Sequence, residues 1–178
     1  YAHWKKEDEP PTPDAEARWI YTDNSGATVT EDGTFEGMWN KAMDLSRAST
    51  VTLLKDITAT NGSFGRGDGF SDSGFVLVPD VAAITLDLNG KTLSRNLDTP
   101  QQNGHVIEIE QGAIFTLTYT SEAQTGMLTG GNTTDTGGGI LHRGDEFYFR
   151  GGKITGNKAE KNGGGVYHYA GSFQMKNG

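Results

Sequence analysis

Carboxylates are the side chains of this sequence best suited to chemistry, since it contains no cysteine and only 4 histidines. Hydrolysis of a glycosidic bond uses two carboxyl groups that converge on one groove. The acidic residues that could supply such a pair are Asp68, Asp72, Asp80, Asp87, Glu108, Glu110, Asp135, Asp145 and Glu146. Glu108 and Glu110 alternate with isoleucines, so we expect both on one outward, solvated strand face, with a catalytic pair as the alternative. We therefore name no catalytic residue.

The segment "NGSFGRGDGFSDSG" at 61–74 is rich in glycine and is expected to be a surface loop between strands. Its acids Asp68 and Asp72 could hold Ca²⁺, but their spacing matches no known calcium loop, so a flexible polar loop is the alternative. Arg66 and Asp68 belong to an Arg-Gly-Asp tripeptide, which resembles the integrin-binding motif of host matrix proteins. Arg66, Asp68 and Asp72 are therefore candidate ligand-binding residues, and Ca²⁺ is the one cofactor considered.

The elements that must position these side chains repeat along the chain. Residues 126–151 align with 152–177 without a gap, which places His142 on His168 at an offset of 26 residues. Such a period is typical of a solenoid, in which each unit buries its apolar face against the next. The strand-like pieces of the first copy lie near 127–129, 139–142 and 146–150. The sequence thus predicts a parallel β-helix with three strands per coil and about 26 residues per repeat.

The strands "EFYFR" and "SFQMK" alternate, so every second residue should face the interior. The segment "AIFTLT" offers the same pattern 32 residues earlier. The expected core ladder consists of Phe115, Leu117, Phe147, Phe149, Phe173 and Met175. The acids form no such ladder, because Asp135 and Asp145 align with Lys161 and Gly171.

Three tyrosines, Tyr148, Tyr167 and Tyr169, are expected to point outward along one flank. Exposed aromatic rings could stack on sugars, although plain β-propensity explains tyrosine in a strand equally well. His142 and His168 should have Cα atoms ~4.8 Å apart in adjacent coils. Two ligands are too few for a metal site, so we interpret this pair as structural, whichever way the rings face.

One helix is expected near residues 35–46, because its apolar residues recur at helical spacing and Thr34 is suited to be its N-cap. These apolar residues are Phe35, Met38, Trp39, Ala42, Met43 and Leu45. We expect the helix to cap the first coil, whose open edges would otherwise be exposed. Residues 15–50 would then form an N-terminal cap, and residues 51–178 the β-helix.

The first residues read "YAHW", followed by "KKEDEPPTPD", a charged segment with three prolines. "YAHW" resembles the last strand of the Listeria–Bacteroides repeat, a small β-grasp module of bacterial surface proteins. Residues 1–14 are therefore expected to be the end of a preceding module plus a semi-rigid linker, with a frayed tail as the alternative.

The segments "TLDLNGKTLS", "GHVIEIEQGAIFTLT" and "GGKITGNKAEKNGGGVYHYAGSFQMKNG" resemble the right-handed parallel β-helix surface proteins of the pectate-lyase-like superfamily. The "ITGNKA…GGGVY" element is also similar to the repeat of chlamydial polymorphic outer-membrane proteins, although Gly165 stands at its usual alanine. The resemblance implies an all-β, right-handed parallel β-helix. It also implies that further coils follow the last one here.

In function, the resemblance implies a non-catalytic adhesin or stalk module, secreted and attached to a bacterial cell wall, with neighbouring domains in a longer protein. Its partners would be a glycan or a host surface protein. The alternative is a polysaccharide lyase or glycoside hydrolase of the pectate-lyase-like fold. The net charge of −8 argues against nucleic acid as a partner, and no apolar run is long enough to insert into a membrane.

Overall fold

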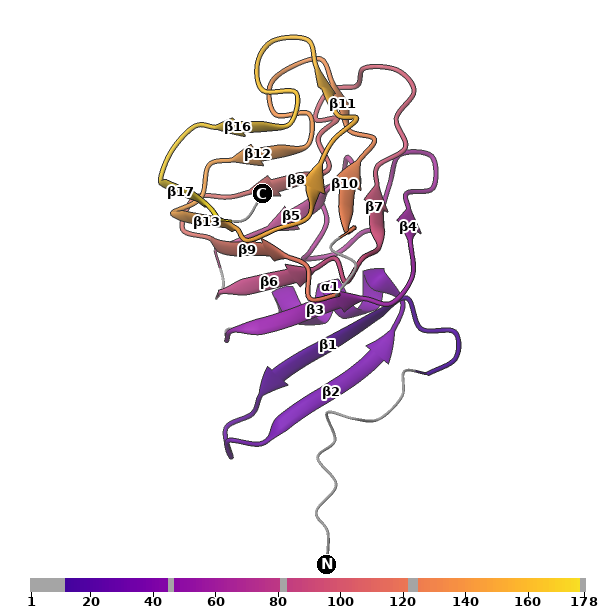
Figure 1. Ribbon diagram of the computed structural model, residues 1–178, viewed down its shortest axis with the longest axis vertical. Helices are drawn as coiled ribbons and strands as arrows, with labels where there is room; N and C mark the ends of the chain where they lie inside the picture. The colour runs from indigo at the N-terminus through magenta and orange to yellow at the C-terminus, as the bar shows by residue number, and fades with distance from the viewer. Residues whose placement is uncertain (1–11, 45–46, 81–82, 122–124, 177–178) are drawn as a thin grey trace, which may run out of the picture.

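The largest sheet has seven strands and mixes both strand orientations. The computed structural model describes residues 12–44, 47–80, 83–121 and 125–176, and Figure 1 gives the arrangement of their elements. In this sheet β1 pairs antiparallel with both β2 and β3, and the strands beyond β3 pair in parallel. Its strands, in spatial order, are β17 (Ser172–Met175), β13 (Glu146–Phe149), β9 (Ile114–Thr118), β6 (Ile84–Asp87), β3 (Ser49–Leu53), β1 (Ala17–Thr22) and β2 (Thr28–Gly33).

Three smaller sheets are parallel throughout. The first has the order β14 (Lys153–Ile154), β10 (Met127–Thr129), β7 (Thr92–Ser94) and β4 (Ile57–Thr58). The second has the order β16 (Val166–His168), β12 (Ile140–His142), β8 (Ile107–Ile109) and β5 (Val76–Val78). The third pairs β11 (Asn132–Thr133) with β15 (Lys158–Ala159).

These sheets contradict the expected all-β right-handed parallel β-helix of three strands per coil. The fold is mostly β, with one mixed and three parallel sheets and one short helix. The offset between paired strands also varies: Ser49 pairs with Ile84, 35 residues later, whereas Phe147 pairs with Phe173, 26 residues later. The 26-residue spacing holds between the last two repeats, whereas upstream spacings are longer and the first strands of the sheet pair antiparallel, which the repeat did not predict.

The N-terminal part belongs to the same sheet as the rest of the chain. The turn "DNSG" joins β1 to β2, and β1 hydrogen-bonds to β3. The domain boundary expected after residue 50 therefore falls inside β3. Most of the expected 1–14 module end and linker, including "YAHW", lies outside the described residues.

A helix forms close to where it was expected. Helix α1 (Phe35–Met43) begins after Thr34, whose Oγ1 accepts a hydrogen bond of 3.1 Å from the Gly37 amide. The helix contacts β1, β2 and β3, so it packs on the N-terminal strands of the mixed sheet. Its buried face comprises Phe35, Met38, Trp39, Ala42 and Met43, whereas Leu45 lies outside the described residues.

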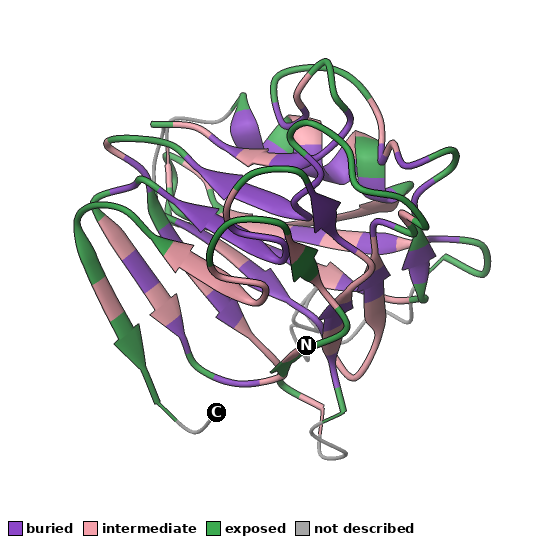
Figure 2. Cartoon of the chain, turned by 90° about the horizontal axis from the view of Figure 1, so that it is seen from above, coloured by how far each residue is buried: buried purple, intermediate pink, exposed green. Residues whose placement is uncertain are grey.

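The stacked rings of Phe115, Phe147 and Phe173 become less buried toward the last strand of the chain. The ring of Phe147 lies 5.8 Å from that of Phe115 and 4.9 Å from that of Phe173. Phe115 and Phe147 are fully buried, whereas Phe173 is half-buried. Of the other ladder residues, Leu117 and Phe149 are buried and Met175 is exposed. Figure 2 shows this fall in burial toward the last strands of the chain.

No helix in the described part of the chain is long and apolar enough to cross a membrane.

Candidate functional site: a tyrosine-lined groove

The outer face of the β5-β8-β12-β16 sheet carries a column of side chains set by strand register. Glu108 of β8 pairs with Leu141 of β12, and Leu141 pairs with Tyr167 of β16. Because successive side chains of a strand point to opposite faces, these three share one face. Their neighbours Ile107, Ile109 and Ile140 are buried in the core.

A second column lies two residues further along the chain, directly after the end of each strand. Backbone hydrogen bonds continue there, from the Arg143 amide to Ile109 O at 2.8 Å and from the Tyr169 amide to His142 O at 2.9 Å. Period-2 alternation therefore places Glu110, Arg143 and Tyr169 on the same outer face as the first column. The tyrosines at 167 and 169 consequently stand next to each other at one end of both columns.

The two columns line two adjoining hollows. One, of about 440 Å³, is lined by residues that include Glu108, Glu110, Arg143, Asp145 and Tyr169. The other, of about 470 Å³, is lined by Asp135, Thr136, Leu141, Arg143, Tyr167 and Tyr169. Since Arg143 and Tyr169 line both hollows, we treat them as one surface and call it the tyrosine groove.

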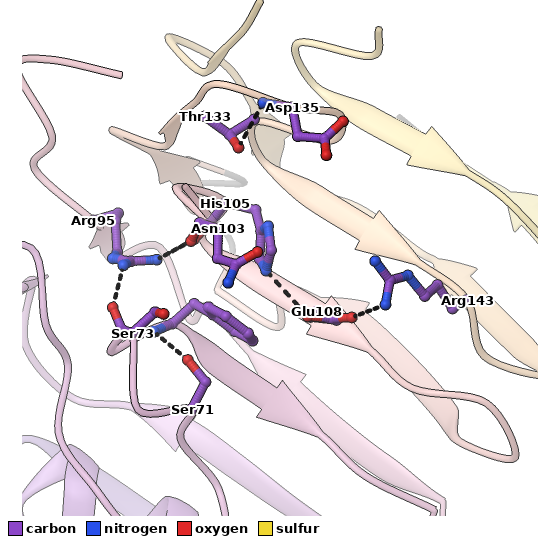
Figure 3. Close-up of polar contacts among 10 residues, drawn as sticks. Ser71, Ser73, Arg95, Asn103, His105, Glu108, Thr133, Asp135 and Arg143 are labelled. Carbon is purple, nitrogen blue, oxygen red and sulfur yellow. Dashed lines mark hydrogen bonds and ion pairs between the residues drawn. The ribbon is translucent and has the colours of Figure 1, made fainter. Parts of the chain in front are cut away.

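Glu108 is the anchored carboxylate of the groove, not the solvated side chain that the strand alternation predicted. It is 9% exposed, and Figure 3 shows it between His105 and Arg143. Its Oε1 lies 2.9 Å from Arg143 Nη1, and its Oε2 lies 3.3 Å from His105 Nε2. Burial disfavours ionisation of Glu108, but the contacts with His105 and Arg143 outweigh burial and hold the pKa of the carboxyl below its usual value.

The surroundings of Glu110 shift its pKa in the direction opposite to that of Glu108. Burial and the like charge of Glu108 raise the pKa of its carboxyl, and Arg143 offsets this only in part. Among the described residues, no hydrogen bond or ion pair engages its side chain. Asp145 is also exposed, and one of its oxygens accepts a hydrogen bond of 3.2 Å from the Gly112 amide. The groove therefore contains two carboxylates without an ion-pair partner, Glu110 and Asp145, beside the anchored Glu108 and Asp135, which pairs with Lys161.

The structure separates Tyr148 from the other two tyrosines. Tyr148 belongs to β13 of the seven-stranded sheet, where its hydroxyl donates a hydrogen bond of 2.6 Å to Glu146. The guanidinium of Arg150 lies 5.1 Å from the centre of its ring. Tyr167 belongs to β16 of a different sheet and Tyr169 follows that strand directly, so the expected strip of three tyrosines reduces to two.

The 61–74 loop carries Arg66, Asp68 and Asp72 on a different part of the molecule, beside α1. Asn40 of the helix donates a hydrogen bond of 2.9 Å to Arg66 O and accepts one of 3.0 Å from the Gly69 amide. The loop also buries two aromatic rings, Phe64 and Phe70, edge-on against Phe35. Although the three candidate side chains are exposed, the loop backbone is therefore tied down.

The two histidines differ in burial, which the sequence left open: His142 faces the interior, whereas His168 is exposed. His142 is fully buried, with its ring edge-on to Phe147, and its Nδ1 lies 2.8 Å from that of His168. Burial, together with the charge of His168, lowers the pKa of His142 to about 4. Within residues 12–44, 47–80, 83–121 and 125–176, no three histidine or carboxylate side chains are grouped as metal ligands.

Sequence reasoning missed the basic residues that organise this region. Arg95 is 1% exposed and donates only to backbone carbonyls: those of Gly62 and His105, that of Asn103 at 3.3 Å and that of Ser73 at 2.5 Å. It thereby ties the 61–74 loop to the segment that leads into β8 (Figure 3). A lone arginine gives no sequence signal of burial, whereas Arg143 could have been found by aligning it with Tyr169 in the repeat.

Comparison with known proteins identifies no relative of this chain. No known protein family matches the chain, and neither a curated protein nor a solved structure is significantly similar to it. The resemblance to bacterial surface proteins and to the Listeria–Bacteroides repeat therefore stays a prediction, and the function must be argued from the groove itself.

Proposed function

We propose that this chain is a non-catalytic carbohydrate-binding module, and that the tyrosine groove is its binding site. The observation that carries the proposal is the pairing of Tyr167 and Tyr169 on one face, two residues apart, beside the guanidinium of Arg143. Tyr169 is 72% exposed, so the face of its ring is accessible to a ligand. Aromatic faces stack on the apolar faces of sugar rings, and their hydroxyls remain available to the sugar hydroxyls.

Polar groups around the rings supply hydrogen bonds of both kinds. Arg143 offers donors, with its side chain 54% exposed, and Glu110 and Asp145 offer acceptors. A sugar site in general combines a hydrophobic platform with a few placed polar groups. The groove has both parts, and its length over two adjoining hollows suits a chain of sugars better than a single ring.

The groove is also fixed before any ligand arrives. Its floor is a parallel sheet, and the ion pair of Glu108 with Arg143 limits the rotation of the guanidinium. Binding to a preformed site avoids the entropic cost of ordering side chains. This supports a recognition role for the sheet face.

An extracellular position on a bacterial surface belongs to the same proposal, and it rests on the sequence resemblance alone. A glycan on a host or a neighbouring cell would then be the natural partner of the groove, with adhesion as the consequence. The 61–74 loop, which carries Arg66 and Asp68, lies apart from the tyrosine groove. A host protein that bound this loop would therefore make a contact independent of the groove.

A lyase or hydrolase is the second candidate, because Glu108 and Glu110 have pKa values shifted in opposite directions within one groove. Such a pair is typical of acid–base catalysis. However, both oxygens of Glu108 are engaged, by His105 and by Arg143. A nucleophile or base needs a free oxygen facing the substrate, so we favour binding.

One experiment tests both candidates. The protein is incubated with a panel of plant, mucin and microbial polysaccharides, and co-sedimentation and newly released reducing or unsaturated ends are both measured. We expect binding without release. Tyr169→Ala should weaken binding by about five- to tenfold, because one stacking platform is lost.

Tyr148→Ala is the matched control, since it removes a tyrosine from the other sheet. Equal weakening by both variants, or none by Tyr169→Ala, would show that the groove is not the binding site. Release of ends that disappears in Glu110→Gln would replace the binding module by an enzyme.

A further inference from the structure

We infer that the tyrosine groove selects glycans that carry free, protonated amino groups, such as chains of de-N-acetylated hexosamine. This inference rests on the proposed function, because it assigns a ligand class to the same groove. It is supported by the negative charge of those groove carboxylates that form no ion pair.

Two of the carboxylates in the groove are neutralised locally. Glu108 pairs with Arg143 at 2.9 Å, and Asp135 pairs with Lys161 Nζ at 3.1 Å. Arg143 is the one cationic residue lining either hollow, and its charge is already matched by Glu108. The guanidinium is therefore poorly placed to attract an acidic sugar.

The other two carboxylates form no ion pair within the described residues. Glu110 and Asp145 line the same hollow as Tyr169, and no lysine or arginine pairs with either side chain. Burial first, and then the like charge of Glu108, raise the pKa of Glu110, and a bound cation would oppose both effects. A cation held between these carboxylates and the exposed ring of Tyr169 would gain Coulombic and cation–π attraction together.

The same charges exclude the opposite ligand class. A uronate or sialate would place its carboxylate beside Glu110 and Asp145, and like charges held close together are repelled. The net charge of −8 for the whole chain adds to that repulsion at low ionic strength. A polycationic peptide would satisfy the charges as well, but the paired tyrosine rings suit the flat faces of sugar rings.

The test compares three oligosaccharides of equal length by calorimetric titration against the whole 178-residue chain: a β-1,4-glucosamine hexamer, its N-acetylated counterpart and an oligogalacturonate. The pH is set so that the amines are protonated and the carboxylates ionised. We expect the glucosamine hexamer to bind about tenfold more tightly than the N-acetylated hexamer, and the difference to shrink at high salt.

The double variant Glu110→Gln/Asp145→Asn should remove most of that difference, because the amide side chains keep an oxygen that accepts hydrogen bonds but lose the negative charge that attracts an amine. Its control is Asp68→Asn/Glu160→Gln, which removes two exposed acids outside the groove and should preserve the preference. If the control abolishes the preference as well, the selectivity arises from net charge and the inference is overturned.

The outcomes separate the inference from the proposed function. Equal affinity for the amino and N-acetylated hexamers, or tighter binding of oligogalacturonate, overturns the amine preference but leaves a glycan-binding groove. No binding of any sugar overturns both, and binding of oligolysine in that case would identify a peptide site instead. Preference for the glucosamine hexamer that depends on Glu110 and Asp145 supports the inference.

Discussion

Nη1 of Arg143 lies 2.9 Å from Oε1 of Glu108, although Glu108 belongs to β8, Arg143 follows the neighbouring β12, and the two stand 35 positions apart in the sequence. This contact turns a buried carboxylate into a fixed part of the groove wall. Because Glu108 also contacts His105, the pair connects the exposed face of the sheet with the segment that Arg95 holds in place.

Glu108→Gln should destabilise the protein. The substitution preserves size but leaves Arg143 without its counter-charge, and a charged hydrogen bond of this kind contributes roughly 1.5–3 kcal/mol. Urea denaturation at neutral pH measures the change in the free energy of unfolding. Glu110→Gln, two residues away and without a side-chain partner, should stay within about 0.5 kcal/mol of the unmodified protein. Similar losses in both variants would contradict the anchoring role of Glu108.

Stability should fall as the pH is lowered from about 6.5 toward 4. His142 has a pKa of about 4 in the folded protein, and burial lowers the pKa of His105 as well. In the unfolded chain both titrate near 6.5, so below that pH the unfolded state binds more protons and is favoured. The slope should reach up to roughly 1.4 kcal/mol per pH unit for each histidine.

His142→Leu isolates the contribution of the buried histidine of this pair. Its stability should depend less steeply on pH between 6.5 and 5, the range above the titration of most carboxylates. Thermal unfolding followed by circular dichroism across this range measures the slope. A slope unchanged by the substitution would mean that His142 is protonated in the folded state.

Two repeat-equivalent glycines should differ in their tolerance of alanine. A Cβ added at Gly138 would lie 2.3 Å from Lys158 O and 2.6 Å from Gly164 O, both backbone atoms. A Cβ at Gly164 would meet only Asn157 O, at 3.3 Å. Gly138→Ala should therefore cost roughly 1–3 kcal/mol by overpacking, and Gly164→Ala less than about 1 kcal/mol.

Urea denaturation of the two variants compares these glycines within one chain. The difference follows from the positions of the two glycines. Lys158 and Gly164 of the next repeat pack on Gly138, whereas Gly164 belongs to the last repeat that the structure describes. Equal costs would show that both positions need glycine for a shared reason, independent of this packing.

Arg95→Met should loosen the 61–74 loop. It removes the donors that satisfy carbonyls of Gly62, Ser73 and two residues before β8. Burial lowers the pKa of Arg95 to about 10, so the guanidinium is charged at neutral pH and its loss leaves several buried acceptors unpaired. We expect a loss of about 3 kcal/mol in unfolding free energy, since each unpaired group costs roughly 1–3 kcal/mol.

Hydrogen exchange locates this effect. The Phe64 amide, which donates a 2.9 Å hydrogen bond to Gly74 O across the loop, should exchange faster in Arg95→Met. Arg150→Met is the control, because Arg150 is exposed and lies over Tyr148. Unchanged protection at Phe64 would mean that the hydrophobic contacts of the loop hold it without Arg95.

Prediction from sequence succeeded where near neighbours decide the outcome. The N-cap of α1 depends on Thr34 and the amide three residues later, so its position could be read from the sequence. Prediction failed for the coil architecture, because the repeat of the last strands carries no information on the antiparallel pairing of β1 with β2 and β3. Glu108 was misjudged for a related reason: alternation places it outward, but only the packing of His105 and Arg143 makes it buried.

The sequence by itself determined local features: the apolar face of α1, the alternation that separates Phe147 from Tyr148, and the alignment of His142 with His168. Each depends on residues close in sequence or on a direct repeat. Only the tertiary structure decided that Tyr167 and Tyr169 share a groove with Glu110 and Arg143 while Tyr148 lies on another sheet. The physical reason is that the lengths of the connections and the register of strands distant in sequence determine which side chains meet.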